Sequence, residues 1–527
     1  MRRRVQRNCK IAILLVLYIL GFFQFVSNGS WGGNGGPDGG PGPGRHGHPQ
    51  WHFTKPKRVF NGTMFVPNKE LASLAQLQSG TQPFQAAAAD TSGGGSGDGK
   101  DMGSLGGERS NDIAAAGNDS SAASDGGVGA TLQNVTDVLR TMRELNEAQT
   151  VRNKEIFGPV TNETVVIAIQ VHNRVQYLRQ LIVSLSQARG IESTLIIFSH
   201  DFWDPEINRL VASVDFAKTM QIFYPYSIQT HANEFPGESR NDCPRDIKKK
   251  QANRVKCANA DFPDLYGHYR EAKFAQLKHH WWWKANRIFE QLALTKHHAG
   301  LVLFLEEDHY VSEDFLHVLN LVNEKRIAHH EDCDIICLGT YLKSPDMKET
   351  AKQVDVSLWV SSKHNMGMAF TRKLWEEVRS CRACFCNFDD YNWDWSLYHV
   401  SLVCLERKIK VMLVKAPRVF HIGECGVHHH NKKDCEAKAT VKRVLDILSR
   451  ASKFLFPDKL VIKDIPIRRK LKVPLGNGGW GDIRDKTLCL SMASTLRDED
   501  DVQAALLLAR ERIEQVKEAE KQGKLPL

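Results

Sequence analysis

The sequence predicts an α/β domain with a mostly parallel central sheet, placed behind a membrane-spanning segment and a disordered stem. Three observations support this expectation: apolar runs that end in polar residues alternate with helical segments, an uncharged apolar segment lies near the N-terminus, and a Gly-rich tract separates the two. The 527 residues are 42% hydrophobic and 25% charged, which is typical of globular protein. We therefore expect one folded domain, at residues 156–490.

The N-terminal segment has the features of a signal-anchor. Residues 1–10 are basic, and residues 11–26 are apolar and uncharged, which is near the lower length limit of a membrane-spanning helix, about 17 residues. A cleaved signal peptide is the alternative, but Phe22, Phe23 and Phe25 stand where a cleavage site needs small residues. Because basic residues stay in the cytosol, we expect a single-pass type II membrane protein whose later residues are luminal.

Residues 27–155 are expected to form the stem. Up to about residue 130 the tract is dominated by Gly, Ser, Ala, Pro and Asn, with too little apolar mass to offset the entropy lost on ordering. A neck helix is predicted within 131–155, where four apolar residues have helical spacing: Val135, Leu139, Met142 and Leu145. The charged segment 491–527 is expected to be an appended helix without chemistry.

Cysteines and glycosylation sequences fit a secretory route. Eleven of the twelve cysteines lie between Cys243 and Cys489, and in an oxidising lumen they are expected to pair, with an odd one left over. Four Asn-x-Ser/Thr sequences are candidate glycosylation sites: Asn61, Asn118, Asn134 and Asn162. The formal net charge of +9 is small for this length and does not predict nucleic-acid binding.

Four buried strands are predicted, each followed by polar residues. They lie in the segments TVVIAIQVHNR, STLIIFSHD, LVLFLEEDHY and CDIICLGTY, with helical periodicity in YLRQLIVSLSQARG between the first two. Parallel strands end at one edge of a sheet, where α/β domains bind ligands. The polar ends QVHNR, SHD, EEDHY and LGTY are therefore predicted to form one site.

The EED sequence within this site suggests a metal. Glu306 and Asp308 are two residues apart on an extended segment, so their carboxylates share a face and suit Mg²⁺ or Mn²⁺ bound to a diphosphate. A solvated acidic strand end is the alternative. The sequence has no GxxxxGK[ST] loop and no convincing GxGxxG, so standard NTPase and dinucleotide sites are excluded and a nucleotide-sugar transferase is favoured.

Over roughly residues 160–490 the chain resembles the N-acetylglucosaminyltransferase II family, Golgi enzymes that build N-glycans. The resemblance rests on long, ordered motifs rich in Trp and His: QVHNR, IIFSHDFW, GHYREAKF with KHHWWWK, FLEEDHY, LGTY, HNMG, DDYNWDW and NGGWGDIRD. It implies a GT-A fold, Mn²⁺ as cofactor, and inverting transfer of GlcNAc from UDP-GlcNAc in β1,2 linkage to the α1,6-arm mannose, during hybrid-to-complex N-glycan maturation.

The resemblance also implies residue roles. The donor would be bound by two segments and one aspartate: Gln170, Val171, His172, Asn173 and Arg174, then Gln276, Leu277, Lys278, His279 and His280, with Asp201 holding the uracil or ribose. Asp308 and His421 would bind the metal, and Asp394 would be the catalytic base. Without the resemblance, His421 on an apolar stretch would be an ordinary half-buried histidine.

Inverting transfer independently needs one carboxylate to take the proton of the acceptor hydroxyl. Asp389, Asp390 and Asp394 compete for that role, and Trp393 and Trp395 would exclude water around Asp394 and raise its pKa. The alternative is an acidic helix start beside core tryptophans. Of the three tryptophans in KHHWWWK we expect one or two in the core.

The resemblance implies three disulfides: Cys243–Cys257, Cys381–Cys404 and Cys386–Cys489. In CGVHHHNKKDC a disulfide Cys425–Cys435 is favoured over a zinc site. The chain departs from the family at Cys333 and Cys337, which on a strand would be about 13 Å apart, beyond disulfide reach, and the state of Cys384 is left open. Pro345 stands near the position of a substrate-contacting arginine of the family.

The expected partners are UDP-GlcNAc, a mannose-terminated N-glycan and the Golgi membrane, with no nucleic acid, and a homodimer is an open alternative. Three rival functions remain: a β1,2-GlcNAc transferase acting on another mannose, a catalytically silent glycan-binding Golgi protein, and a luminal nucleotide-sugar hydrolase.

Overall fold

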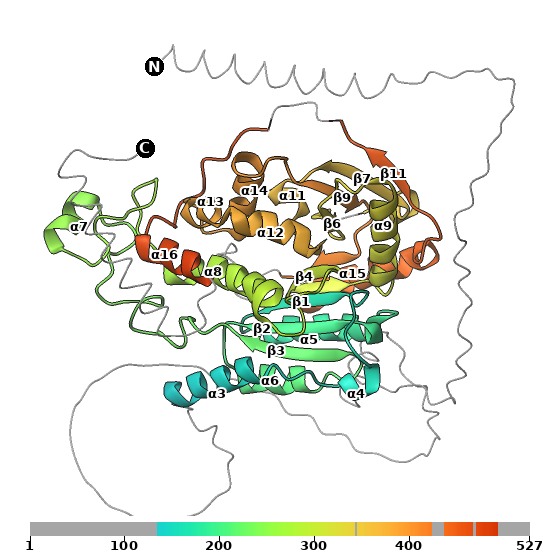
Figure 1. Cartoon of the computed structure of the whole chain (residues 1–527), viewed down its shortest axis with the longest axis horizontal. Helices are drawn as coiled ribbons and strands as arrows, with labels where there is room; N and C mark the ends of the chain where they lie inside the picture. Colours follow the sequence, from blue (N-terminus) through green and yellow to red (C-terminus); the bar gives the residue numbers. More distant parts are fainter. Residues whose placement is uncertain (1–133, 343–344, 424–436, 467–470, 494–527) are drawn as a thin grey trace, which may run out of the picture. The chain divides into compact units, whose positions relative to one another are not determined.

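The computed structural model describes most of the chain after residue 133 (Figure 1), namely residues 134–342, 345–423, 437–466 and 471–493. Several predictions lie outside these residues: the span 11–26, most of the stem, Asn61, Asn118, Cys425, Cys435, and the C-terminal segment after residue 493. Among the described residues, no helix is long and apolar enough to cross a membrane.

A nine-stranded sheet forms the centre of the described domain, in the order β11-β7-β9-β6-β8-β4-β1-β2-β3. Its strands are β1 Val166–Val171, β2 Leu195–His200, β3 Lys218–Phe223, β4 Val302–Glu306, β6 Ile335–Cys337, β7 Gln353–Leu358, β8 Met368–Phe370, β9 Lys410–Val414 and β11 Val461–Asp464. The block β4-β1-β2-β3 is parallel, and β8 runs antiparallel to β4 and β6. The predicted mostly parallel sheet is confirmed, and its four predicted strands are β1, β2, β4 and β6.

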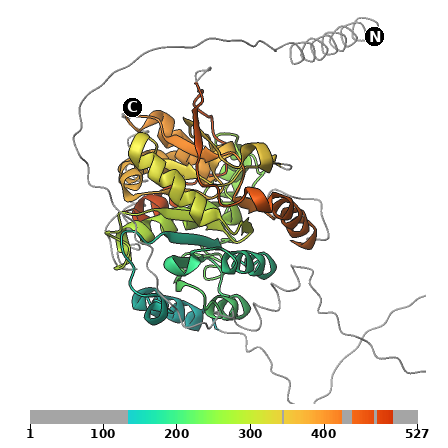
Figure 2. The same ribbon diagram turned by 90° about the vertical axis from the view of Figure 1, so that its right-hand side faces the viewer.

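Both faces of the sheet are covered, which explains why the central strands β1, β2 and β4 are nearly continuous apolar runs up to their polar ends. Along β1, Ile167 and Ile169 face one core cluster and Val166 and Ala168 face the other. The first face carries α5 Val175–Ser186, α6 Pro205–Ala212 and α9 Phe315–His329. The opposite face carries α8 Ala272–Asn286, α12 Arg372–Ser380, α13 Arg382–Asn387, α14 Trp393–Val403 and α16 Ile483–Met492 (Figures 1 and 2).

A small second sheet and further helices complete the domain. A second, two-stranded sheet pairs β5 His309–Val311 with β10 Val419–His421 in antiparallel register. The remaining helices are α4 Lys154–Phe157, α7 Lys249–Val255, α10 Met347–Thr350, α11 Ser361–His364 and α15 Ala437–Ala451. Three single turns of other helix types are η1 Ile191–Ser193, η2 Arg287–Gln291 and η3 Ser452–Phe454.

The expected neck helix is present as α3 Val135–Ala148. Of its four regularly spaced apolar residues Met142 is buried, together with Val138, against Phe223 at the edge strand β3, whereas Val135 is 46% exposed. The end of β3 also holds the helix through Asn146, whose side chain exchanges two hydrogen bonds with the Phe223 backbone. The candidate glycosylation residues Asn134, at the helix N-cap, and Asn162 are both exposed.

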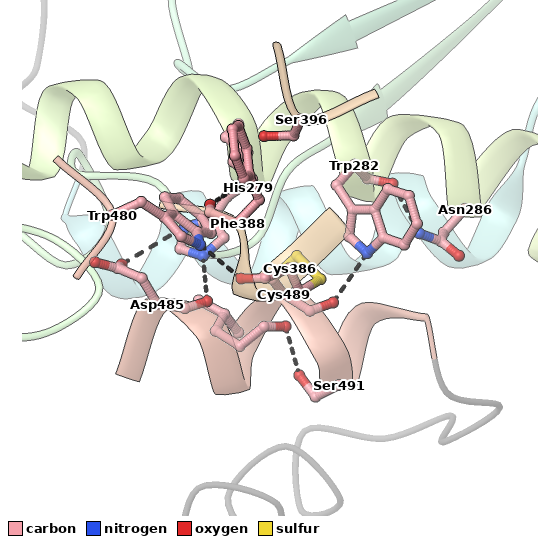
Figure 3. The surroundings of a disulfide bond; sticks show 12 residues. His279, Trp282, Asn286, Cys386, Phe388, Ser396, Trp480, Asp485, Cys489 and Ser491 are labelled. Atoms are coloured by element: carbon pink, nitrogen blue, oxygen red, sulfur yellow. Dashed lines mark hydrogen bonds and ion pairs between the residues drawn. A yellow bond between two sulfur atoms is a disulfide. The ribbon is translucent and has the colours of Figure 1, made fainter. Parts of the chain in front are cut away.

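All three consecutive tryptophans of α8 are buried, so the expectation of one or two was wrong. The helix lies between the sheet and α13, α14 and α16, which leaves no side of it facing solvent at this point. Figure 3 shows how Trp282 is fixed there: its indole Nε1 donates a 2.9 Å hydrogen bond to the carbonyl oxygen of Cys489.

The three disulfides implied by the resemblance are confirmed: Cys243–Cys257, Cys381–Cys404 and Cys386–Cys489. Cys386–Cys489 joins α13 to α16 beside Trp480, whose Nε1 donates to the Cys386 carbonyl at 2.7 Å (Figure 3). Cys333, Cys337 and Cys384 are free thiols among the described residues, in agreement with the distance argument for the first two.

Candidate active site

The carboxyl ends of β1, β2 and β4 meet at one edge of the sheet, as predicted. The parallel register places Gln170 of β1 beside Ser199 of β2 and Glu306 of β4. Side chains at matching positions of parallel strands project from the same face, so these three polar residues form a row. β6 is antiparallel to β8, which is itself antiparallel to β4, so β6 also ends at this edge.

A cavity of about 850 Å³ opens at this edge. Residues from three of the four predicted polar ends, QVHNR, EEDHY and LGTY, contribute to its wall, together with the start of α14, whereas no residue of SHD lines it. The lining residues are Gln170, His172, Arg174, Leu277, Glu306, Asp308, His309, Tyr341, Ser362, Asn365, Tyr391, Asn392, Trp393, Asp394, Trp395, His421, Gly423 and Asn477.

Asp308 and His421, the two predicted metal ligands, are neighbours in this wall. His421 Nε2 lies 3.3 Å from Asp308 Oδ2, which also accepts a 2.9 Å hydrogen bond from Arg174. The antiparallel pairing of β5 with β10 creates this contact, because it places His421 opposite His309, directly after Asp308. Burial alone would raise the pKa of Asp308, but the His421 hydrogen bond and the Arg174 charge hold it well below its ordinary value.

The donor set around Asp308 fits a hard divalent cation. Its Oδ1 atom is buried and has no hydrogen-bond partner among the described residues. Potential ligand atoms of Glu306, Asp308 and His309 all lie within 4.8 Å of one another. Carboxylate and imidazole donors of this kind suit Mn²⁺ or Mg²⁺. Gly423 keeps the space open, since a Cβ there would lie 2.2 Å from Asp308 Oδ2.

Asp201 is at the centre of a second polar group, at the end of β2. Its carboxylate contacts His172 at 2.6 Å, Gln276 at 3.0 Å and His280 at 3.2 Å. Burial alone would raise the pKa of Asp201, but the two histidines outweigh it and hold the pKa well below the ordinary value. The carboxylate is therefore ionised at neutral pH and fixes the residues around it.

The predicted donor-binding residues are only partly brought together. Four of them line the cavity, namely Gln170, His172, Arg174 and Leu277. Gln276 and His280 contact Asp201, which does not line the cavity but contacts His172 of its wall. Four others lie elsewhere: Val171 is buried in the core, Asn173 is exposed, Lys278 donates to the carbonyls of Phe388 and Asp390, and His279 contacts the carbonyl of Asp485.

Of the three competing aspartates, Asp394 alone lines the cavity. Its Oδ2 accepts hydrogen bonds from Ser361 at 3.0 Å and Asn365 at 2.8 Å, and its Oδ1 accepts one from the Trp395 backbone. Burial raises the pKa of Asp394, against the effect of these hydrogen bonds. Its position at the start of α14 therefore gives a carboxylate that faces the cavity with neutral partners.

Asp389 and Asp390 have structural roles instead. Asp390 accepts four hydrogen bonds, two from Asn392 and two from Asn477. Asp389 accepts from the backbone of Leu265 and of Trp480. Their carboxylates hydrogen-bond the NGGWGD segment and hold it next to the loop that precedes α14.

Several site residues were missed by the sequence analysis. Glu307, the middle residue of EED, accepts from the Arg174 side chain and from the His172 backbone, and so shapes the QVHNR loop. Asn365 lies in HNMG, which was named only as a family motif, and Tyr341 lies in LGTY, which was predicted to reach the site without a role for any single residue. Pro345 is not among the residues that line the cavity.

Comparison with known proteins places the chain in a family. The model of the family described as N-acetylglucosaminyltransferase II (MGAT2) matches residues 139–489. The chain belongs to the N-acetylglucosaminyltransferase II family. It is therefore an enzyme of the glycosyltransferase class, and the cavity at the edge of the sheet is its candidate active site.

Relatives in this family carry the name alpha-1,6-mannosyl-glycoprotein 2-beta-N-acetylglucosaminyltransferase. The pig protein is 45% identical over 348 residues, which cover 66% of this chain and 77% of the relative. The Arabidopsis thaliana protein is 33% identical over 349 residues, covering 66% and 78%. Among solved structures, Staphylococcus aureus TarS 1–349 is 10% identical, covers 49% of this chain and 59% of its own, and has a TM-score of 0.26, too low to bear on the fold.

Proposed function

We propose that this enzyme transfers GlcNAc from UDP-GlcNAc, with inversion, to the α1,6-arm mannose of an N-glycan in β1,2 linkage, during hybrid-to-complex N-glycan maturation. One observation carries the proposal: the same cavity holds a carboxylate suited to a metal, Asp308, and a separate buried carboxylate with neutral partners, Asp394. Transfer from a nucleotide sugar needs both, one for the diphosphate and one for the acceptor proton. We further propose that the sheet is that of a GT-A glycosyltransferase.

Asp308 and His421 would hold Mn²⁺, with Glu306 close enough to contribute. The bound cation would neutralise the diphosphate and favour its departure. Gln170, His172, Arg174 and Leu277 would contact the donor directly, while Asp201 would hold the uracil or ribose with support from Gln276 and His280. The proposal leaves out Lys278 and His279, which are buried away from the cavity.

Asp394 would act as the general base. Its Oδ1 atom would take the proton from the 2-hydroxyl of the acceptor mannose as that oxygen forms a bond to the anomeric carbon of GlcNAc. The bond between this carbon and the diphosphate oxygen breaks at the same time, so UDP leaves with the electron pair and the configuration inverts. The raised pKa of Asp394 brings its basicity closer to that needed at neutral pH.

Outside the catalytic domain we propose a Golgi location. Residues 11–26 would anchor the chain as a single-pass type II protein, with residues 1–10 in the cytosol and the catalytic domain in the lumen. The three disulfides between luminal cysteines support an oxidising compartment.

An acceptor panel tests the proposed function. The full chain would be incubated with UDP-GlcNAc, Mn²⁺ and defined N-glycans that expose mannose on the α1,6 arm, the α1,3 arm or neither. We expect GlcNAc on the α1,6-arm mannose alone. Transfer to the α1,3 arm would favour the related transferase, and release of free GlcNAc at equal rates with and without acceptor would favour a hydrolase.

A further inference from the structure

One face of α8 carries three polar residues at a spacing of four: Gln276, His280 and Lys284. This spacing aligns side chains along one side of a helix. Each of the three contacts a residue at the carboxyl edge of the sheet. Gln276 donates to Asp201, His280 lies 2.8 Å from Ser199 Oγ, and Lys284 donates to Gln170 Oε1 at 2.9 Å.

Lys284 is a buried charged residue: its side chain is 1% exposed and lies directly behind Gln170 of the cavity wall. An ammonium group is costly to bury unless it is paired. Burial lowers the pKa of Lys284 to about 7, against the negative charges of Glu306 and Asp201, which favour the ammonium form. The side-chain carbonyl of Gln170 accepts a hydrogen bond from Nζ, and the Phe304 ring lies 5.5 Å from Nζ. The groups that favour the charged form therefore belong to the site itself.

The contact also decides the orientation of the Gln170 amide. The Lys284 amino group donates to Gln170 Oε1, and because its ammonium form has three donors and no acceptor, that form holds the amide with its oxygen toward Lys284. Its NH₂ group is then directed elsewhere. Gln170 itself lines the cavity, between Ser199 and Glu306 in the row across the strands.

We propose that Lys284 is a positioning residue, which holds the Gln170 amide so that its NH₂ group donates to an oxygen of the nucleotide part of the donor. This inference rests on the proposed function, because it assumes that the cavity binds a nucleotide sugar. Lys284 itself touches no substrate. Its effect should therefore appear in nucleotide affinity and not in the turnover of the saturated enzyme.

The test is the substitution Lys284→Met in the full chain, with UDP affinity measured by calorimetry in the presence of Mn²⁺. Loss of the oriented hydrogen bond should weaken UDP binding about tenfold, equivalent to about 1.4 kcal/mol, and raise the donor KM similarly while kcat changes little. Lys284→Gln keeps a polar side chain, but its amide can both donate and accept and so no longer fixes the Gln170 amide. UDP binding should therefore weaken in this variant too. If the methionine variant does not fold, the glutamine variant provides the same measurement.

Lys218→Met is the matched control. Lys218 is also a buried lysine that donates to carbonyl oxygens, but it lies on the edge strand β3 and those oxygens belong to Phe157 and Glu192, which do not line the cavity. Its loss should lower thermal stability and leave UDP affinity unchanged. Equal weakening of UDP binding in both methionine variants would overturn the proposal, since general destabilisation would then explain it.

A double-mutant cycle with Gln170→Ala gives the second readout. If Lys284 acts only through Gln170, adding Lys284→Met to Gln170→Ala should not weaken UDP binding further. Additive losses, or wild-type UDP affinity in the folded Lys284 variants, would overturn the positioning role. Absence of UDP binding by the wild-type chain would instead overturn the proposed function.

Discussion

Asn365 Nδ2 donates a 2.8 Å hydrogen bond to Oδ2 of Asp394, while its own Oδ1 accepts one of 2.9 Å from Tyr341. The amide therefore links the proposed base to Tyr341, in the segment that follows β6. Because Asn365 and Ser361 both bind Oδ2, the other oxygen of Asp394 has a single backbone partner. Oδ1 is thus the atom placed to receive a proton.

Asp394→Asn should separate catalysis from donor binding. The amide keeps the size of the side chain but cannot accept the acceptor proton, so single-turnover transfer should fall by about 10² to 10⁴. UDP affinity, measured by calorimetry, should stay close to that of wild type, because the nucleotide is held elsewhere in the cavity. Asp201→Ala should show the reverse pattern, with UDP affinity lost first.

Asp390→Asn is the control for Asp394. The Asp390 carboxylate accepts four hydrogen bonds from the NGGWGD segment and from Asn392, so its loss should lower stability rather than remove a base. If Asp394→Asn loses UDP affinity as badly as activity, or keeps near-wild-type turnover, the assignment of the base is wrong.

Activity should depend on a divalent cation at Asp308. Excess chelator should abolish transfer and Mn²⁺ should restore it, since the buried Oδ1 atom has no hydrogen-bond partner in the part of the chain that the structure describes and is available as a ligand. Asp308→Ala should abolish both transfer and Mn²⁺ binding, the latter followed by calorimetry. Asp355→Ala removes a carboxylate paired with Lys415, which directly follows the neighbouring strand β9, and should alter neither. Full turnover in excess chelator would contradict the metal assignment.

The strands that carry the site could be predicted because each combines a buried apolar run with a polar end. β1, β2, β4 and β6 are all of this kind. β5 and β10 are three residues long and nothing in either indicates its partner, so the pairing that brings His421 to Asp308 was accessible only through the family resemblance.

Contacts across long stretches of sequence account for most of what was missed. The carboxylate of Asp394 depends on Ser361 and Asn365, about one α/β unit earlier, and nothing local to either residue indicates this. The segment 276–280 is different, because helical geometry alone separates the residues that face the site from those that do not. Gln276 and His280 face the sheet edge, while Lys278 and His279 face α13 and α16. The spacing of four between Gln276 and His280 would also have predicted that Lys284 faces the sheet edge.

The disulfide Cys386–Cys489 should contribute more stability than Cys243–Cys257. Its cysteines are 103 residues apart, against 14, and a longer loop removes more entropy from the unfolded chain. The chain-entropy argument gives about 4.7 kcal/mol for a loop of this length and about 3 kcal/mol for the shorter one. Denaturant unfolding of the paired Cys→Ala variants would measure both, and an equal or larger loss at Cys243–Cys257 would contradict the prediction.

Stability should fall as the pH is lowered from 7 to 5, through histidines that the fold keeps neutral. Burial lowers the pKa of His200 to about 3 and of His279 and His364 to about 4. In the unfolded chain these groups have pKa values near 6.5 and take up protons that the folded chain excludes. Their contribution is present above the unfolded pKa and is lost as the pH falls, by up to about 1.4 kcal/mol per pH unit for each histidine.

His279→Gln tests this linkage at one residue. His279 Nε2 lies 3.0 Å from the carbonyl oxygen of Asp485, a contact that a glutamine amide can also make, but glutamine does not titrate. The variant should therefore lose less free energy of unfolding than wild type between pH 7 and pH 5, as measured by urea unfolding at both values. His172 acts in the opposite sense, because Asp201 raises its pKa against the effect of burial, but it is unchanged in both proteins and cancels in the comparison. Equal pH slopes in the two proteins would show that His279 is protonated in the folded state as readily as in the unfolded chain.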